Sequence, residues 1–140
     1  MSDTSFMVNL VTPEGQLFDG EAEFVVVPAY DGELGFLYLR APVMSSLGPG
    51  EMRIHVADSE KIEHFAVSGG FVGNDGHKVV VLASRAQRLD VFNLEALQDH
   101  QAEIDQQLIE LAEDDPERPF LREEMTWVKL LIRLVGRANL

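Results

Sequence analysis

The sequence of 140 residues has no cysteine, few basic residues and no long apolar run. The absence of cysteine excludes disulfide bonds and thiolate metal sites, and it is typical of a reducing compartment. The 11 Lys and Arg residues stand against 24 Asp and Glu, which gives a net charge of −13. A chain this acidic lacks the basic patch that nucleic acid requires and is repelled by anionic lipid, so neither is expected as a partner.

Long hydrophobic segments are also missing. The longest unbroken apolar run covers residues 79–83, far short of the roughly 20 residues of a membrane-spanning helix. The N-terminal segment MSDTSFMVNL has neither a basic stretch nor a long apolar core, so it is not expected to be a signal peptide. We therefore expect no direct insertion of the chain into lipid.

The residue types that carry catalysis do not form a recognisable set. The four histidines lack the spacing of a metal-binding pair: His55, His64, His77 and His100. The segment 68–70 is not a nucleophile elbow, and no glycine-rich loop carries a phosphate-binding lysine. The sequence therefore predicts a protein without catalytic residues, metal or cofactor.

The first two thirds of the chain carry strand signals. The apolar run 24–27 ends at Pro28, and Asp31-Gly32 and Asn74-Asp75-Gly76 are typical turn sequences. At Ser68-Gly69-Gly70 we expect a bulge or a close approach of two backbones. Short strands with frequent turns predict a sandwich or barrel over residues 1–90.

From Asn93 onward the apolar residues recur at helical spacing. Asn93 is suited to cap the first helix, and the two prolines of segment 114–119 end it. A second amphipathic segment follows, with Trp127 one position off its apolar seam. Residues 91–140 are therefore predicted to form an antiparallel two-helix hairpin.

The two predicted helices carry opposite charge. Residues 95–115 contain eight acidic residues and no Lys or Arg. The second helix carries a basic stripe, which we define by four residues spaced seven, four and four positions apart: Arg122, Lys129, Arg133 and Arg137. Two interpretations stay open: a solvated face with salt bridges to the first helix, or a surface for an acidic partner.

Three segments, in this order, resemble the N-terminal domain of the epsilon subunit of F-type ATP synthases. They are VTPEG at 11–15, VVVPAYDGELGFL at 25–37 with Ala41-Pro42 after it, and FAVSGGF at 65–71 followed by VVVLA at 79–83. The resemblance spans roughly residues 6–90, and a helical pair follows it as in the family. It implies a flattened sandwich of about ten strands.

The resemblance also implies a function. Such a chain is a non-catalytic rotor subunit of the proton-translocating ATP synthase, and it couples proton flow through the ring of c subunits to ATP synthesis. Its expected partners are the gamma subunit and the c ring, with the alpha and beta subunits reached through C-terminal helices that block ATP hydrolysis. It is expected at the cytoplasmic face of the bacterial plasma membrane, and as a monomer when isolated.

Two sets of residues follow from the family pattern. The expected contact with the c ring consists of Asp31, Glu33, Tyr38 and Arg40, although Tyr38-Leu39-Arg40 replaces the usual Pro-Gly-His. The basic stripe is the expected contact with the catalytic head. The motif of ATP-binding members keeps only its arginine here, as Arg122, so ATP is not expected as a cofactor.

An alternative from another class is a free-standing sandwich that binds a carbohydrate or a peptide and dimerises through a helical tail. It accounts for the turn pattern but not for the order of the three segments.

Overall fold

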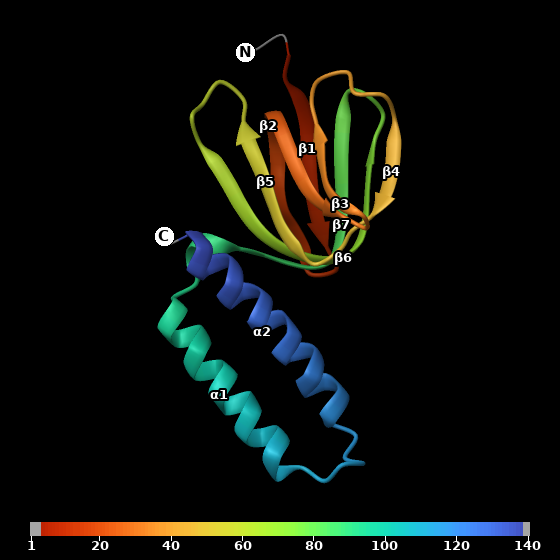
Figure 1. Ribbon diagram of the computed structural model, residues 1–140. Helices are drawn as coiled ribbons and strands as arrows, with labels where there is room; N and C mark the ends of the chain where they lie inside the picture. Colours follow the sequence, from red (N-terminus) through yellow and green to blue (C-terminus); the bar gives the residue numbers. More distant parts are fainter. Residues whose placement is uncertain (1–3, 139–140) are drawn as a thin grey trace. The chain divides into compact units, whose positions relative to one another are not determined.

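The computed structural model describes residues 4–138, and the chain divides into two compact units, Met1–Arg88 and Leu89–Leu140. Unit 1 consists of strands and unit 2 of helices (Figure 1). The elements are β1 (Phe6–Thr12), β2 (Gly15–Ala29), β3 (Gly32–Phe36), β4 (Val43–Ser46), β5 (Gly50–Val56), β6 (Ile62–Asn74), β7 (Lys78–Arg88), the short 3-10 helix η1 (Leu89–Val91), α1 (Leu94–Glu110) and α2 (Arg118–Ala138).

The strands of unit 1 form a sandwich whose sheet closes on itself. The strand order is β1-β7-β6-β5-β2-β3, and β1 also pairs with β2, so five strands form a ring. β4 pairs with β6 outside this ring. Because closure gives most strands a partner on both sides, β3 and β4 are the edge strands.

The predicted sandwich is confirmed, but it has seven strands rather than about ten. The dipeptide Asp19-Gly20 is typical of a turn, but it lies inside β2, where Gly20 pairs with Val8. The segment Ser68-Gly69-Gly70 also lies inside one continuous strand, β6. Glycine therefore marks positions within long bent strands here, and not the ends of short ones.

The close backbone approach expected in β6 is found at Gly70. A Cβ atom on Gly70 would lie 1.8 Å from the carbonyl oxygen of Leu82, and the residue has φ +101°. Pairing stays in register on either side, with Ser68 opposite Arg85 and Gly70 opposite Ala83. The feature is therefore a close approach without a bulge, and only glycine fits it.

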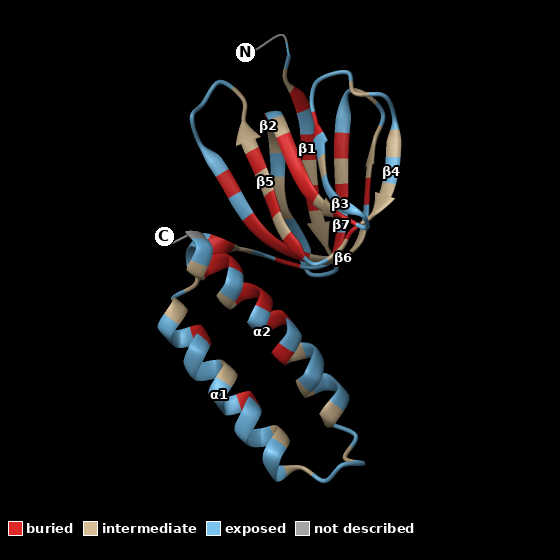
Figure 2. Cartoon of the chain, viewed as in Figure 1, coloured by how far each residue is buried: buried red, intermediate tan, exposed pale blue. Residues whose placement is uncertain are grey.

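The core of unit 1 is built from alternate residues of its strands. In β1, Phe6, Val8 and Leu10 are buried, while Met7 between them is exposed. Figure 2 shows the same alternation of buried and exposed residues along the other strands. This period of two is typical of strands that bury one face and expose the other.

Unit 2 contains the predicted helical hairpin. The side chain of Asn93 caps α1 as expected, accepting a hydrogen bond from the amide of Ala96 at 3.2 Å. The two helices pack through a seam of Ile104, Met125 and Val128, with Leu108, Leu121 and Ile132 beside it. Pro119 falls in the first turn of α2, where proline is tolerated.

Within residues 4–138 no helix is long and apolar enough to cross a membrane.

A buried carboxylate ties the end of β7 to β6. Glu63 is only 8% exposed. It lies 3.0 Å from the ammonium of Lys61 and forms a short ion pair with Arg88. The Arg88 guanidinium also stacks over the ring of Phe65, 5.0 Å from its centre. Burial raises the pKa of Glu63, but the hydrogen bonds and charges of Lys61 and Arg88 outweigh it and hold the pKa below its ordinary value.

This network predicts a loss of stability in acid. Since the pKa of Glu63 is lower in the folded state than in the unfolded state, its stabilisation is complete above the ordinary value of 4.5 and disappears as the pH falls further. Glu63→Gln should lower the free energy of unfolding by about 1–3 kcal/mol at pH 7. The difference from the wild type should shrink below about pH 4, as measured by urea unfolding across the pH range.

The matched control is Glu60→Gln, because Glu60 is exposed in the adjacent loop. An equal effect of the two substitutions, or a difference that persists unchanged into acid, would contradict the role given to Glu63.

Candidate interaction surfaces

The turn between β2 and β3 presents two of the predicted ring-contact residues. Asp31 is exposed beside Gly32, which has φ +129°. The side chain of Glu33 is 60% exposed, and its Oε2 accepts a hydrogen bond from Nη1 of Arg53 at 3.1 Å. The same Nη1 lies 3.1 Å from Glu51. Burial lowers the pKa of Arg53, but the hydrogen bonds and charges of Glu51 and Glu33 outweigh it and raise that pKa above its ordinary value.

The other two ring-contact residues lie in the loop after β3, which packs on the hairpin between β6 and β7. The amide of Leu39 donates to the carbonyl of Gly76 at 3.1 Å. The side chain of Asn74 donates to the carbonyl of Arg40 at 3.2 Å. The ring of Tyr38 meets the ring of His77 edge to face, with centres 6.3 Å apart. These contacts hold the loop firmly against its neighbour.

The hairpin beneath this loop is itself braced by a carboxylate. Asp75 accepts hydrogen bonds from the amides of His77 and Lys78, each at 2.9 Å. These backbone hydrogen bonds lower the pKa of Asp75. The hairpin is therefore a fixed support for the loop.

The structure thus separates the four residues into two pairs at opposite ends of β3. Asp31 precedes β3 and Glu33 is its second residue, whereas Tyr38 and Arg40 follow the end of the strand at Phe36 (Figure 1). From Glu33 to Phe36 the extended strand rises roughly 10 Å, at about 3.3 Å per residue.

An apolar surface that the sequence analysis did not identify lies on the outer side of β4, β6 and β7. We call it the apolar face and define it by Met44, Phe71 and Leu82, which are 78%, 59% and 52% exposed. Phe71 pairs with Leu82, while Met44 pairs with Gly73 two residues from Phe71, so the three side chains share one side of the sheet.

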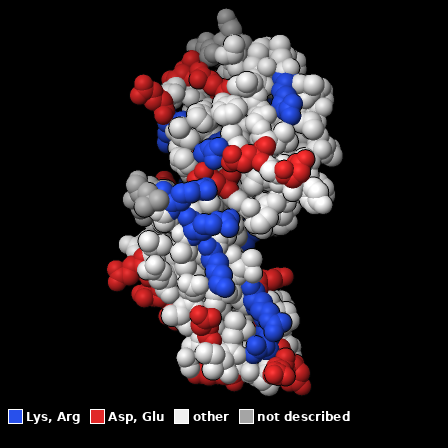
Figure 3. Space-filling model, viewed as in Figure 1, with Lys and Arg blue, Asp and Glu red and all other residues white. Residues whose placement is uncertain are grey.

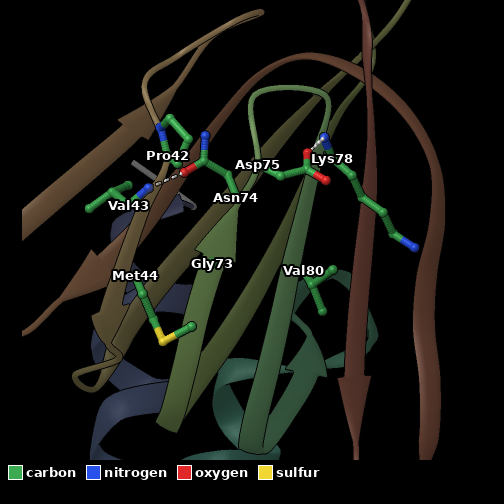
Figure 4. A pocket seen from close by; sticks show the side chains of 8 residues that line it. All are labelled: Pro42, Val43, Met44, Gly73, Asn74, Asp75, Lys78 and Val80. Carbon is green, nitrogen blue, oxygen red and sulfur yellow. Dashed lines mark hydrogen bonds between the residues drawn. The ribbon is translucent and has the colours of Figure 1, made fainter.

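Next to Met44 the surface is hollowed. The hollow has a volume of about 480 Å³ and is lined by Pro42, Val43, Met44, Gly73, Asn74, Asp75, Lys78 and Val80. Figure 4 shows these side chains around it, with the amide of Val43 bonded to Asn74 at one rim. Exposed apolar side chains beside a concave surface are typical of protein interaction sites.

The basic stripe of α2 is exposed. Figure 3 shows Lys and Arg side chains in a continuous band along the hairpin. In the described part of unit 2, Arg122, Lys129 and Arg133 make no ion pair with α1. The ion pair found between the helices there joins His100 and Glu124 at 3.5 Å. The first of the two open interpretations included salt bridges between the stripe and the first helix. Among the described residues these three cations form none.

Another arginine does join the helices. Arg118, the first residue of α2, donates through Nη1 to the carbonyls of Leu108 and Leu111 at 2.7 and 3.2 Å. Both carbonyls belong to the C-terminal end of α1, where main-chain acceptors lack helical partners. Arg118 therefore caps α1 from the neighbouring helix and fixes the turn between them.

The sandwich matches a described family. The sequence profile of "ATP synthase, Delta/Epsilon chain, beta-sandwich domain" aligns with residues 5–89.

The chain belongs to this ATP synthase family.

Individual relatives agree with this assignment. An ATP synthase epsilon chain of Desulforudis audaxviator is 42% identical over 94 residues, which cover 67% of each chain. One of Lactobacillus gasseri is 28% identical over 134 residues, covering 94% of this chain and 92% of the relative. The same fold occurs in a chain of the Euglena gracilis mitochondrial ATP synthase OSCP/F1/c-ring structure, with TM-score 0.69, 20% identity, and coverage of 96% of this chain and 81% of that one.

Membership of the delta/epsilon family confirms the resemblance given by the three segments. It also confirms that the chain is a non-catalytic ATP synthase subunit and not an independent enzyme. The matched segment ends at residue 89, so α1 and α2 lie beyond it. No finding tests the residues assigned to the c ring or to the catalytic head.

The cap that Arg118 forms gives a prediction for this family member. Arg118→Ala leaves two carbonyls of α1 without their charged donor and should cost about 1–3 kcal/mol of hairpin stability. Thermal unfolding of the full chain, followed by circular dichroism at 222 nm, should show helix loss at a lower temperature. Arg122→Ala is the control, because Arg122 is exposed and unpaired within the described residues. Equal melting of the two variants would refute the cap.

Proposed function

We propose that this chain is the epsilon-type subunit of the central stalk in a proton-translocating ATP synthase. The match of the whole sandwich to the delta/epsilon family supports this proposal most strongly. In this role the chain sits at the cytoplasmic face of the bacterial plasma membrane, bound to the rotor and without catalytic residues of its own. Outside the complex it is a monomer. The alternative of a free-standing binding module does not account for the family match.

The two ends of β3 suit two different partners. The exposed carboxylates of Asp31 and Glu33 suit the polar loops of the c ring, because charged turn residues held by an ion pair offer directed, water-accessible contacts. The loop of Tyr38 and Arg40 adjoins the apolar face and suits the gamma subunit, because burial of exposed Met44, Phe71 and Leu82 drives protein association. The expected contact with the ring included all four residues, and their places at the two ends of β3 favour dividing them between two partners.

The helical hairpin suits a regulatory role. Its basic stripe is exposed, and within residues 4–138 Arg122, Lys129 and Arg133 form no ion pair with α1. For these three cations an acidic segment of the beta subunit need not compete with salt bridges to α1. Partly buried charge pairs with that segment could contribute about 1–3 kcal/mol each. The hairpin would thereby restrain ATP hydrolysis when it reaches the alpha and beta subunits.

The ring contact is tested by reversing one charge. Glu33→Lys should lower ATP-driven proton pumping in membrane vesicles several-fold, because it places a cation where the ring meets a carboxylate. Folding should be nearly unchanged, since an exposed ion pair is worth about 0–1 kcal/mol. The control is Arg53→Gln, which removes the partner of Glu33 but keeps its carboxylate. Normal pumping with Glu33→Lys would refute the contact.

The regulatory role is tested by removing the basic stripe. Replacing Arg122, Lys129, Arg133 and Arg137 with alanine should raise steady-state ATP hydrolysis by the purified complex and leave assembly intact. A charge-preserving control, with lysine at the three arginine positions, should keep hydrolysis low. Salt should mimic the alanine variant, because the Debye length falls from about 10 Å at 0.1 M to about 3 Å at 1 M. Equal rates of wild type and alanine variant would leave the stripe as a solvated face.

A further inference from the structure

Leu39 combines two features that are unfavourable for an isolated chain. Its backbone has φ +60°, in the left-handed region that branched side chains rarely adopt. Its side chain is 58% exposed. Among the described residues the other non-glycine with positive φ is Asp58, at φ +55°, and Asp tolerates this conformation far better than Leu. Leu39 is therefore both strained and solvated.

The fold does not require a leucine at this position. What the loop contributes to the sandwich comes from its backbone: the amide of Leu39 donates to Gly76, and the carbonyl of Arg40 accepts from Asn74. Glycine or asparagine would make the same main-chain contacts with less strain. An unfavourable residue that the surrounding structure holds in place is typical of a functional position.

The neighbours of Leu39 extend its apolar character. Leu37 is 61% exposed and Tyr38 37% exposed, so residues 37–39 present three apolar side chains to solvent. The loop continues directly into Pro42, Val43 and Met44, which line the hollow of the apolar face. No Asp or Glu occurs from residue 34 to residue 50, although the chain has 24. Arg40 is the one charged residue of this stretch.

We propose that residues 37–39 form an apolar knob that inserts into an apolar pocket of the protein covering the apolar face. Continuity with that face, and the absence of carboxylates, fit a partner surface that is apolar and neutral or acidic at its rim. The inference rests on the proposed function, which makes this partner the gamma subunit. The strain at Leu39 is then offset by burial of its side chain in the complex.

The test measures affinity and stability together. The binding partner is a purified complex of the alpha, beta and gamma subunits from the same organism, prepared without this chain and without the c ring. Leu39→Asn and Leu39→Gly should each weaken binding about 10-fold or more, as expected for losing a buried leucine. The melting temperature of the free variants should equal or exceed that of the wild type, because the strain is relieved.

Two controls isolate the side chain from other effects. Asp58→Gly relieves the other left-handed residue without removing apolar surface, and it should leave affinity unchanged. Tyr30→Asn removes an aromatic that is 86% exposed beside the β2–β3 turn, away from the knob, and it should also leave affinity unchanged.

Each other outcome counts against the inference. Unchanged affinity of both Leu39 variants, with the wild type bound, would overturn the knob while leaving the proposed function intact. Lower melting temperatures of both variants would assign Leu39 to the fold and overturn it. A wild-type dimer that Leu39→Asn converts to a monomer would make a second copy the occupant and also overturn it. Failure of the wild-type chain to bind at all would contradict the proposed function and the inference with it.

Discussion

The contact between Gly70 and the backbone of β7 is the constraint on which the sandwich depends. No side chain fits at Gly70, because a Cβ atom would overlap the carbonyl of Leu82 at 1.8 Å. With glycine there, β6 stays one strand and pairs with β5 over its first half and with β4 over its second. This double pairing helps to close the sheet and leaves few free edges. A closed sheet fixes its turns and loops, which is what a rotor subunit that transmits torque requires.

Closure also determines where the interaction surfaces lie. β3 is an edge strand of five residues, and it separates the acidic turn of Asp31 and Glu33 from the apolar loop that follows Phe36. The acidic end is held by Arg53, and the apolar end is held by the hairpin containing Asn74 and Gly76. One small domain thereby offers a charged surface and an apolar surface at a fixed separation. The hairpin of unit 2 adds a third, basic surface, with its helices joined by an apolar seam and Arg118.

Patterns of local origin could be predicted from the sequence. The turn at Asn74-Asp75-Gly76 and the cap at Asn93 each depend on a few neighbouring residues, and both form as expected. The strand number could not, because a glycine inside a bent strand and a glycine at a turn look alike in sequence. The separation of Glu33 from Arg40 by β3 was not evident either, because the two residues are close along the chain.

Long-range features needed the structure. Met44, Phe71 and Leu82 lie on separate strands, and each belongs to a segment whose apolar residues suit a core equally well. Their shared exposure follows from the register of β4, β6 and β7. The left-handed conformation of Leu39 is likewise imposed by the hairpin that the loop packs against. For the loop of Leu39 the sequence does offer a local signal, the three consecutive apolar residues Leu37, Tyr38 and Leu39.

Coupling of the rotor to the c ring by this chain can be measured in a single reconstitution. Membrane vesicles from cells that lack the chain are mixed with the purified wild-type protein, and ATP-driven proton pumping is followed with a pH-sensitive dye. The depleted vesicles should hydrolyse ATP with little pumping, and the added chain should restore pumping and sediment with the membranes. Vesicles that pump equally well with and without the chain would show that it does not couple the rotor to the ring.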